Sequence, residues 1–309
     1  MKSDFLFVGC QAGAEATLKR EVEFRHPKLK PAFSRPGIVT FKGDQPFTLD
    51  FKLNSILARI YGLSFGKKTA EKEKELIAWA TLAQSWSRTG EPDSESPLAK
   101  LDDKVLDVIT IDDGEIWLGC HIHREGMSPR AGGFFPENLK PEGAPSRAYL
   151  KLVEAIERFS IPFKRGQKAL EIGSAPGGAC YGLLERGLSV WGVDPGDMHP
   201  SIVHHHGFIW IKNSINQLHS QDLPSNLDWV LLDMNIEPQD ALSALEKLLK
   251  KLTYRPLGLL LTLKLNRWDM LLNLDHPLER IEALGYRVQG AKQLSNNAQE
   301  CCVFLLPTH

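Results

Sequence analysis

The stretch Lys168-Ala-Leu-Glu-Ile-Gly-Ser-Ala-Pro-Gly-Gly178 decides the fold of this 309-residue chain. It begins with a short, mostly apolar run that is typical of a buried strand, and a glycine-rich turn follows directly. A glycine turn at the carboxyl end of a buried strand lets the backbone approach a bound nucleoside closely. The stretch therefore predicts a strand, a ligand-binding turn and the start of a helix.

Strands and helices alternate through the rest of the C-terminal part. We expect further strands at 189–193, 227–232, 258–265, 286–289 and 301–306, and helices from Ser146 onward and at 178–186, 241–252 and 278–284. Strands separated by helices of about ten residues indicate a mostly parallel sheet covered by helices. The expected fold class of this part is α/β.

A glycine- and proline-rich stretch, 126–145, contains four glycines and four prolines in 20 positions. Such a composition is typical of a loop or linker, and it separates an N-terminal domain, 1–125, from a C-terminal domain, 146–309. The N-terminal part is expected to be a small α+β module, with strands near 5–9, 37–41, 105–111 and 116–122 and helices near 12–24, 49–60 and 71–86.

Composition excludes several classes of protein. The longest apolar run, 257–265, is interrupted by Thr262 and Lys264, whereas a bilayer span needs roughly 20 apolar residues. We expect no secretory signal, because the N-terminus has one basic residue and then an acid. The five cysteines lack Cys-x-x-Cys spacing, so we expect neither a disulfide framework nor a zinc ribbon, and a reducing cytoplasm fits.

The charge balance gives no sign of a nucleic-acid partner. The chain has 37 basic and 38 acidic residues and a net charge of −1. If it binds RNA, we expect a local basic patch to do so.

An acid follows the glycine turn at the spacing of a nucleoside site. Asp194 ends the next predicted strand, 21 residues after Gly173, where a carboxylate can accept hydrogen bonds from ribose hydroxyls. The turn lacks the Gly-x-Gly-x-x-Gly spacing of a dinucleotide site, which favours S-adenosylmethionine over NAD. The alternative is a tight turn beside a surface aspartate. The candidate cofactor-binding residues are Gly173, Ser174, Ala175, Pro176, Gly177, Gly178, Asp194 and Asp233.

At this point the sequence resembles a known family. Gly173–Gly178 looks like the cofactor loop of the FtsJ-like ribose 2′-O-methyltransferases, and Ser146-Arg-Ala-Tyr-Leu-Lys151-Leu is similar to the family's Ser-Arg-x-x-x-Lys-Leu segment. Asp233 matches the acid that ends the fourth strand, Lys264 the second lysine, and Glu300 the glutamate that opens the last strand. The resemblance covers 146–309.

The resemblance implies a Rossmann-like class I methyltransferase domain that uses S-adenosylmethionine. It implies RNA as the substrate, with a cytidine of 23S rRNA favoured, and a THUMP-like RNA-binding module in 1–125. Two departures concern the cofactor. Ala179 stands where the family usually has Trp, and the acid expected near adenine is replaced around Asn213 or Ser214. We expect no metal, although His199 and His204–His206 are close together in sequence.

The resemblance also implies roles for the catalytic candidates Lys151, Asp233, Lys264 and Glu300. A lysine must be neutral to accept the proton of a ribose hydroxyl, and its ordinary pKa is about 10.4. We assign Lys264 as the base and Asp233 as the group that orients it, with Lys151 and Glu300 orienting the ribose. Helical periodicity alone puts Lys151 opposite the apolar stripe, as an ordinary solvated lysine. Methylation of tRNA or protein, or RNA binding without catalysis, are the alternatives.

Overall fold

The computed structural model describes residues 1–89 and 96–308. The chain forms two compact units, Met1–Pro136 and Glu137–His309, and the division falls inside the glycine- and proline-rich stretch 126–145. In the described residues, no helix is both long and apolar enough to span a bilayer. All five cysteines are buried.

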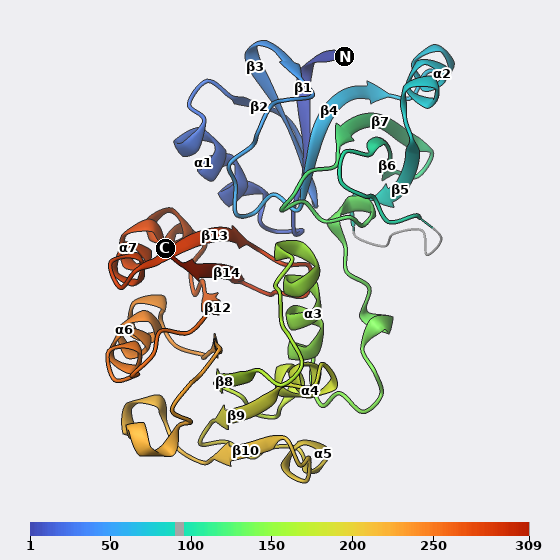
Figure 1. Ribbon diagram of the computed structural model, residues 1–309. Helices are drawn as coiled ribbons and strands as arrows, with labels where there is room; N and C mark the ends of the chain where they lie inside the picture. The colour runs from blue at the N-terminus through green and yellow to red at the C-terminus, as the bar shows by residue number, and fades with distance from the viewer. Residues whose placement is uncertain (90–95, 309) are drawn as a thin grey trace. The chain divides into compact units, whose positions relative to one another are not determined.

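The first unit is a seven-stranded sheet in the order β2-β3-β1-β4-β7-β6-β5 (Figure 1). Its strand pairs are antiparallel except for β5 and β6, which are parallel. Its elements are β1 (Lys2–Gly9), α1 (Glu15–Arg25), β2 (Lys30–Arg35), β3 (Ile38–Thr48), β4 (Ile60–Lys67), α2 (Ala70–Trp79), β5 (Leu82–Ser87), β6 (Lys104–Asp112), β7 (Glu115–Ile122) and the short helix η1 (Ala131–Gly133).

Two helices expected in this unit are wrong. Residues 49–59 form no helix, because the buried carboxylate of Glu21 on α1 accepts hydrogen bonds from Ser55 Oγ and from the Ile56 amide, both at 2.6 Å. The apolar residues there have helical spacing, but their backbone bonds to α1. The helix expected over 71–86 ends at Trp79, since the Thr81 amide donates to Lys104 O and the chain joins the sheet as β5.

The second unit is a seven-stranded sheet in the order β10-β9-β8-β11-β12-β14-β13. The first five strands of this order are parallel, and β14 runs antiparallel between β12 and β13. The elements are η2 (Glu137–Leu139), α3 (Ala148–Phe159), β8 (Lys168–Ile172), α4 (Gly178–Glu185), β9 (Ser189–Val193), α5 (Pro200–Val203), β10 (Phe208–Ile211), η3 (Ile215–Gln217), η4 (Ser220–Asp222), β11 (Trp229–Asp233), α6 (Pro238–Leu249), β12 (Gly258–Lys264), η5 (Trp268–Asn273), α7 (Asp275–Glu282), β13 (Tyr286–Lys292) and β14 (Glu300–Pro307).

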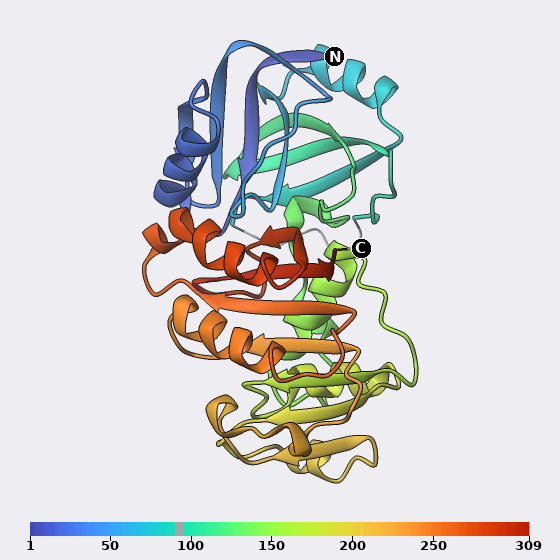
Figure 2. The same cartoon turned by 60° about the vertical axis from the view of Figure 1, so that its left-hand side comes forward.

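This sheet is a Rossmann-like α/β layer with one addition. Its parallel strands follow the order of a doubly wound fold, and the antiparallel β14 is inserted next to the last of them. Helices α3 and α4 cover one face of the sheet, and α6 and α7 cover the other (Figures 1 and 2). The α/β class expected from the sequence is confirmed. The expected strands missed only β10, which extends the sheet beyond β9.

Glycine at position 178 lets α4 start directly against α3. A Cβ atom there would lie 2.2 Å from Ser146 Oγ and 2.9 Å from the backbone of both Ser146 and Tyr149. The close approach of the two helices therefore depends on the missing side chain.

We expect Gly178→Ala to destabilise the protein by about 1–3 kcal/mol, because backbone atoms of α3 must move to admit the methyl group. Thermal unfolding checks this as a lower Tm. Gly207→Ala is the matched control, since a Cβ atom there meets nothing closer than 3.4 Å. Equal Tm values for the two variants would contradict the steric argument.

Candidate active site

Strand register brings three of the predicted residues together at one edge of the second sheet. Lys264, the last residue of β12, is paired directly with Glu300, the first residue of β14. Asp233 ends the neighbouring strand β11 and pairs with Thr262 of β12. Since side chains two residues apart on a strand share a face, Thr262 and Lys264 face the same side, and Asp233 lies beside Lys264.

The fourth residue, Lys151, reaches this group from α3. Its Nζ atom lies 3.2 Å from Asp233 Oδ2 and also contacts Glu300 Oε1. Lys264 Nζ lies 3.0 Å from Asp233 Oδ1 and contacts Glu300 Oε2. Each ammonium group thus bridges both carboxylates, and the four side chains form a closed ring of ion pairs.

Helical periodicity was wrong about the position of Lys151. The helix α3 does bury Tyr149, Leu152 and Ala155, but at Lys151 its opposite face is not open to solvent. The side chain of Lys151 is only 19% exposed, because its ammonium group pairs with Asp233 of β11 and Glu300 of β14.

The ring shifts the pKa values of Glu300 and Lys264 in opposite directions. Burial alone would raise the pKa of Glu300, but the ammonium groups of Lys151 and Lys264 outweigh burial and hold that pKa below its ordinary value. Burial would lower the pKa of Lys264, but Asp233 and Glu300 outweigh it and raise that pKa above 10.5. Lys264 is therefore protonated at neutral pH in the free protein.

The glycine turn adjoins the ring. Gly173 has a φ of +79°, and a Cβ atom on it would lie 2.1 Å from the carbonyl oxygen of Asp233. The turn and the end of β11 are therefore in direct backbone contact. Gly173, Ala175 and Pro176 remain partly or fully exposed, whereas the hydroxyl of Ser174 is buried and donates to Met198 Sδ at 3.6 Å. Gly177 has a φ of +110° and directly precedes Gly178, the first residue of α4.

Asp194, at the carboxyl end of β9, holds the turn in place. Its Oδ2 atom accepts from the amide of Ala175 at 3.0 Å, and its Oδ1 atom accepts from the amide of Gly196 at 2.7 Å. An ionised carboxylate has about four acceptor positions, so two remain for the hydroxyls of a ribose. Asn213 and Ser214 follow β10 at the same edge, because Ile211 pairs with Val193.

Sequence reasoning missed Glu171, the fourth of the five residues of β8, which has only 2% of its surface exposed. Burial raises its pKa to about 8, although a hydrogen bond with Cys180 opposes this. With Lys151 and Asp233 it lines a cavity of about 30 Å³, which is room for a water molecule. An acid between the apolar residues Leu170 and Ile172 of a buried strand is costly to bury, and that was the available signal.

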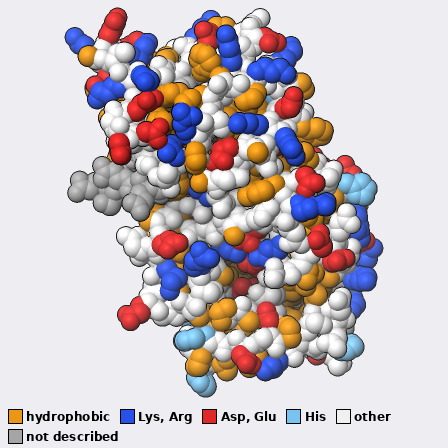
Figure 3. Space-filling view, turned by 180° about the vertical axis from the view of Figure 1, so that it is seen from behind, with side chains coloured by type: hydrophobic (Ala, Val, Ile, Leu, Met, Phe, Trp, Pro, Cys, Tyr) orange, Lys and Arg blue, Asp and Glu red, His pale blue; other side chains and the backbone are white. Residues whose placement is uncertain are grey.

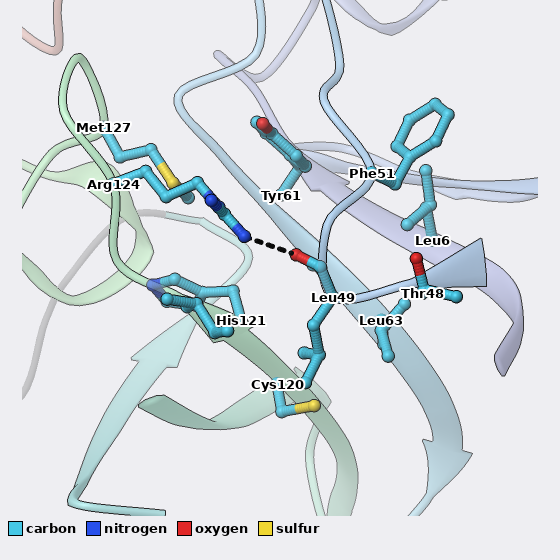
Figure 4. Close-up of a pocket in the computed structure, with 12 residues that line it drawn as sticks. Leu6, Thr48, Leu49, Phe51, Tyr61, Leu63, Cys120, His121, Arg124 and Met127 are labelled. Carbon is cyan, nitrogen blue, oxygen red and sulfur yellow. Dashed lines mark hydrogen bonds between the residues drawn. The ribbon is translucent and has the colours of Figure 1, made fainter. Parts of the chain in front are cut away.

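A second cavity lies in the first unit. It measures about 20 Å³ and is lined by Leu49, Tyr61, His121, Arg124 and Met127 among others (Figure 4). The guanidinium of Arg124 donates to Leu49 O at 3.3 Å and pairs with Asp50 Oδ1 at 2.9 Å. Its wall contains none of the predicted site residues.

Metal ligation finds no support in the described ranges 1–89 and 96–308. They hold no group of three or more His, Cys, Asp or Glu side chains that could bind a metal ion. The rings of His205 and His206 stack on each other, with centroids 4.5 Å apart.

Comparisons with known proteins identify the second unit. Residues 144–266 match the family model described as FtsJ-like methyltransferase. A protein of Laribacter hongkongensis named ribosomal RNA large subunit methyltransferase M is 26% identical, over 92% of this chain and 90% of its own length. Proteins of the same name from Halorhodospira halophila and Pectobacterium carotovorum are 29% and 30% identical, over 58% and 66% of this chain. The chain spans just over half the length of these two relatives, 52% and 57%.

S-adenosylmethionine is the cofactor of this family, and the residues present fit it. The exposed part of the glycine turn leaves the backbone open to a nucleoside, Asp194 keeps acceptor positions for a ribose, and the carboxylate of Asp233 adjoins the turn and favours a nearby sulfonium. The second unit therefore carries a domain of the FtsJ-like methyltransferase family, matched over residues 144–266.

Proposed function

We propose that this protein is an RNA ribose 2′-O-methyltransferase that uses S-adenosylmethionine and acts on a cytidine of 23S rRNA. The closed ring of Lys151, Asp233, Lys264 and Glu300, in backbone contact with the glycine turn through Asp233, is the observation that supports it best. The names of the relatives, which refer to ribosomal RNA of the large subunit, support the substrate. A cytoplasmic location follows from such a substrate.

The reaction needs little more than alignment and the removal of one proton. S-adenosylmethionine supplies an electrophilic methyl group for in-line displacement. Gly173–Gly178 and Asp194 would hold the nucleoside part, and Asp233 would face the sulfonium. Lys264 would take the proton of the ribose hydroxyl, while Lys151 and Glu300 orient that hydroxyl and stabilise the developing negative charge.

Binding of cofactor and substrate must lower the raised pKa of Lys264 before this lysine can act as a base. In the free protein this lysine holds a proton that it must lose before it can act as a base. A positively charged sulfonium nearby lowers the pKa of an ammonium group, and a ribose hydroxyl entering the ring separates the lysine from an acid. Both effects work in the direction that the chemistry needs.

We assign RNA binding to the N-terminal domain, 1–125, as a THUMP-like module joined by the linker 126–145. Cations stack on partly exposed rings in this unit. Arg35 lies 4.9 Å from the ring centroid of Phe33, and Lys72 lies 4.9 Å from that of Phe65. Such pairs bind both bases and phosphates. On the face shown in Figure 3, basic and acidic side chains are interspersed, which favours local contacts with RNA over a broad basic field.

The function is tested with methyl-labelled cofactor and separate pools of 23S rRNA, 16S rRNA, tRNA and protein. We expect label in 23S rRNA, within a dinucleotide that survives alkaline hydrolysis, because a methylated 2′-oxygen cannot attack the adjacent phosphate. Label that alkali releases as mononucleotides would contradict ribose methylation. Label in tRNA or protein would identify the alternative substrates, and binding of RNA without any transfer would favour a non-catalytic protein.

Replacing Lys264 by Arg separates charge from basicity. Arginine keeps the positive charge of the ring but stays protonated at any working pH. We expect kcat to fall by at least about 10²-fold, with cofactor affinity nearly unchanged in a calorimetric titration. Lys247→Arg, on the exposed side of α6, is the control and should behave as the wild type. A Lys264→Arg enzyme with normal kcat would show that another group is the base.

The pH dependence follows from the direction of the Lys264 pKa. Because kcat/KM reports groups of the free enzyme and Asp233 and Glu300 raise the pKa of Lys264 above its ordinary value, the neutral base becomes more abundant throughout the accessible range. We expect kcat/KM to rise roughly tenfold per pH unit between about pH 7 and 9. A plateau below pH 8 would exclude Lys264 as the base.

A further inference from the structure

A buried acid on α3 binds the loop that leads into Glu300. Glu154 lies three residues after Lys151 on the same helix and is 3% exposed. Its Oε1 atom accepts from the amide of Ser295 at 2.6 Å, and its Oε2 atom accepts from the amide of Asn296 at 3.2 Å. These amides belong to the connection between β13 and β14, so the carboxylate fastens that connection to α3.

The same connection contacts Glu300 through a side chain. Asn297 is 4% exposed, and its Nδ2 atom donates to Glu300 Oε1 at 2.9 Å. Its Oδ1 atom accepts from the amide of Leu294 at 2.8 Å, which fixes the orientation of the amide group. Glu154 therefore reaches the ring through a continuous series of contacts, from Ser295 and Asn296 to Asn297 and then Glu300.

We propose that Glu154 is a positioning residue for methyl transfer: by holding residues 294–297 against α3, it fixes through Asn297 the carboxylate that Lys151 and Lys264 both bind. This inference rests on the proposed function. Glu154 touches no reacting atom in it, and its effect is geometric.

In this arrangement, helix α3 determines the positions of two members of the ring. The helix carries Lys151 directly and positions Glu300 through Glu154. Reactive groups must be held to within about 0.5 Å of a productive geometry, and a displacement of about 1 Å can cost on the order of 10²-fold in rate. The ladder with β12 places the backbone of Glu300. Without the attached loop, its side chain would lose the orienting contact with Asn297 and keep the contacts with the two lysines.

Two variants test the two ends of the series in the full-length protein. In Glu154→Gln the amide oxygen can accept one backbone N–H, but the NH₂ group cannot accept the other, and Asn297→Ala removes the contact with Glu300. We expect kcat to fall about 10- to 100-fold in each, with cofactor affinity within about twofold of the wild type. Glu282→Gln is the matched control, because Glu282 also caps a backbone amide, that of Val288 at 3.1 Å, but is exposed and remote from Glu300.

A second readout distinguishes positioning from simple loss of stability. Since Glu300 helps to raise the pKa of Lys264, a displaced Glu300 moves the rising limb of the kcat/KM profile to lower pH. We also expect Glu154→Gln combined with Asn297→Ala to be no slower than the slower single variant, because both changes release the same carboxylate.

The outcomes distinguish a positioning role of Glu154 from a purely structural role and from failure of the proposed function. Normal kcat in Glu154→Gln, in an active wild-type background, would overturn the positioning role and leave the proposed function intact. A lowered Tm with an unshifted pH profile and multiplicative losses in the double variant would show a purely structural acid, which also overturns it. A wild-type protein that methylates no RNA would instead contradict the proposed function.

Discussion

The pairing of Lys264 with Glu300 across β12 and β14 is the contact on which the rest of the site depends. Three ring residues stand at the ends of adjacent strands, so the separation of their backbones is set by the hydrogen bonds of the sheet. A one-residue slip in either strand would turn its side chains to the other face of the sheet. Because β14 runs antiparallel to β12, it begins at the edge where the parallel strands end, and its first residue, Glu300, lies beside Lys264. A parallel strand in this position would begin at the opposite edge of the sheet.

The ion pairs of the ring offset the free-energy cost of burying its charged groups. Two ammonium groups and two carboxylates give no net formal charge, which makes their partial burial tolerable. Removing one partner of a buried pair leaves an uncompensated charge, so each member depends on the others. The same mutual dependence keeps Lys264 protonated in the free protein. In the proposed reaction, a bound sulfonium would lower the pKa of this lysine.

The sequence predicted the second unit well because its elements are local. Buried parallel strands are short apolar runs, and the turn at Gly173 follows one of them. It failed at residues 49–59, where Glu21 replaces helical hydrogen bonds by contacts 34 and 35 residues distant in sequence. It also failed for Lys151 by periodicity alone, since the partner that draws the lysine inward lies on another strand. Glu154 gave no signal, because its role exists only once residues 141 and 142 positions apart are folded together.

The burial of all five thiols has a practical consequence. Cys10 and Cys120 lie in the first unit, and Cys180, Cys301 and Cys302 in the second. Burial raises the pKa of Cys10 to about 12 and holds the pKa values of Cys180 and Cys302 well above the ordinary range, so the folded chain presents neither access nor thiolate to an alkylating reagent. Alkylation of a cysteine therefore reports unfolding around it. Peptide mapping of the alkylated cysteines tells which of the two units unfolded first, without introducing any foreign probe.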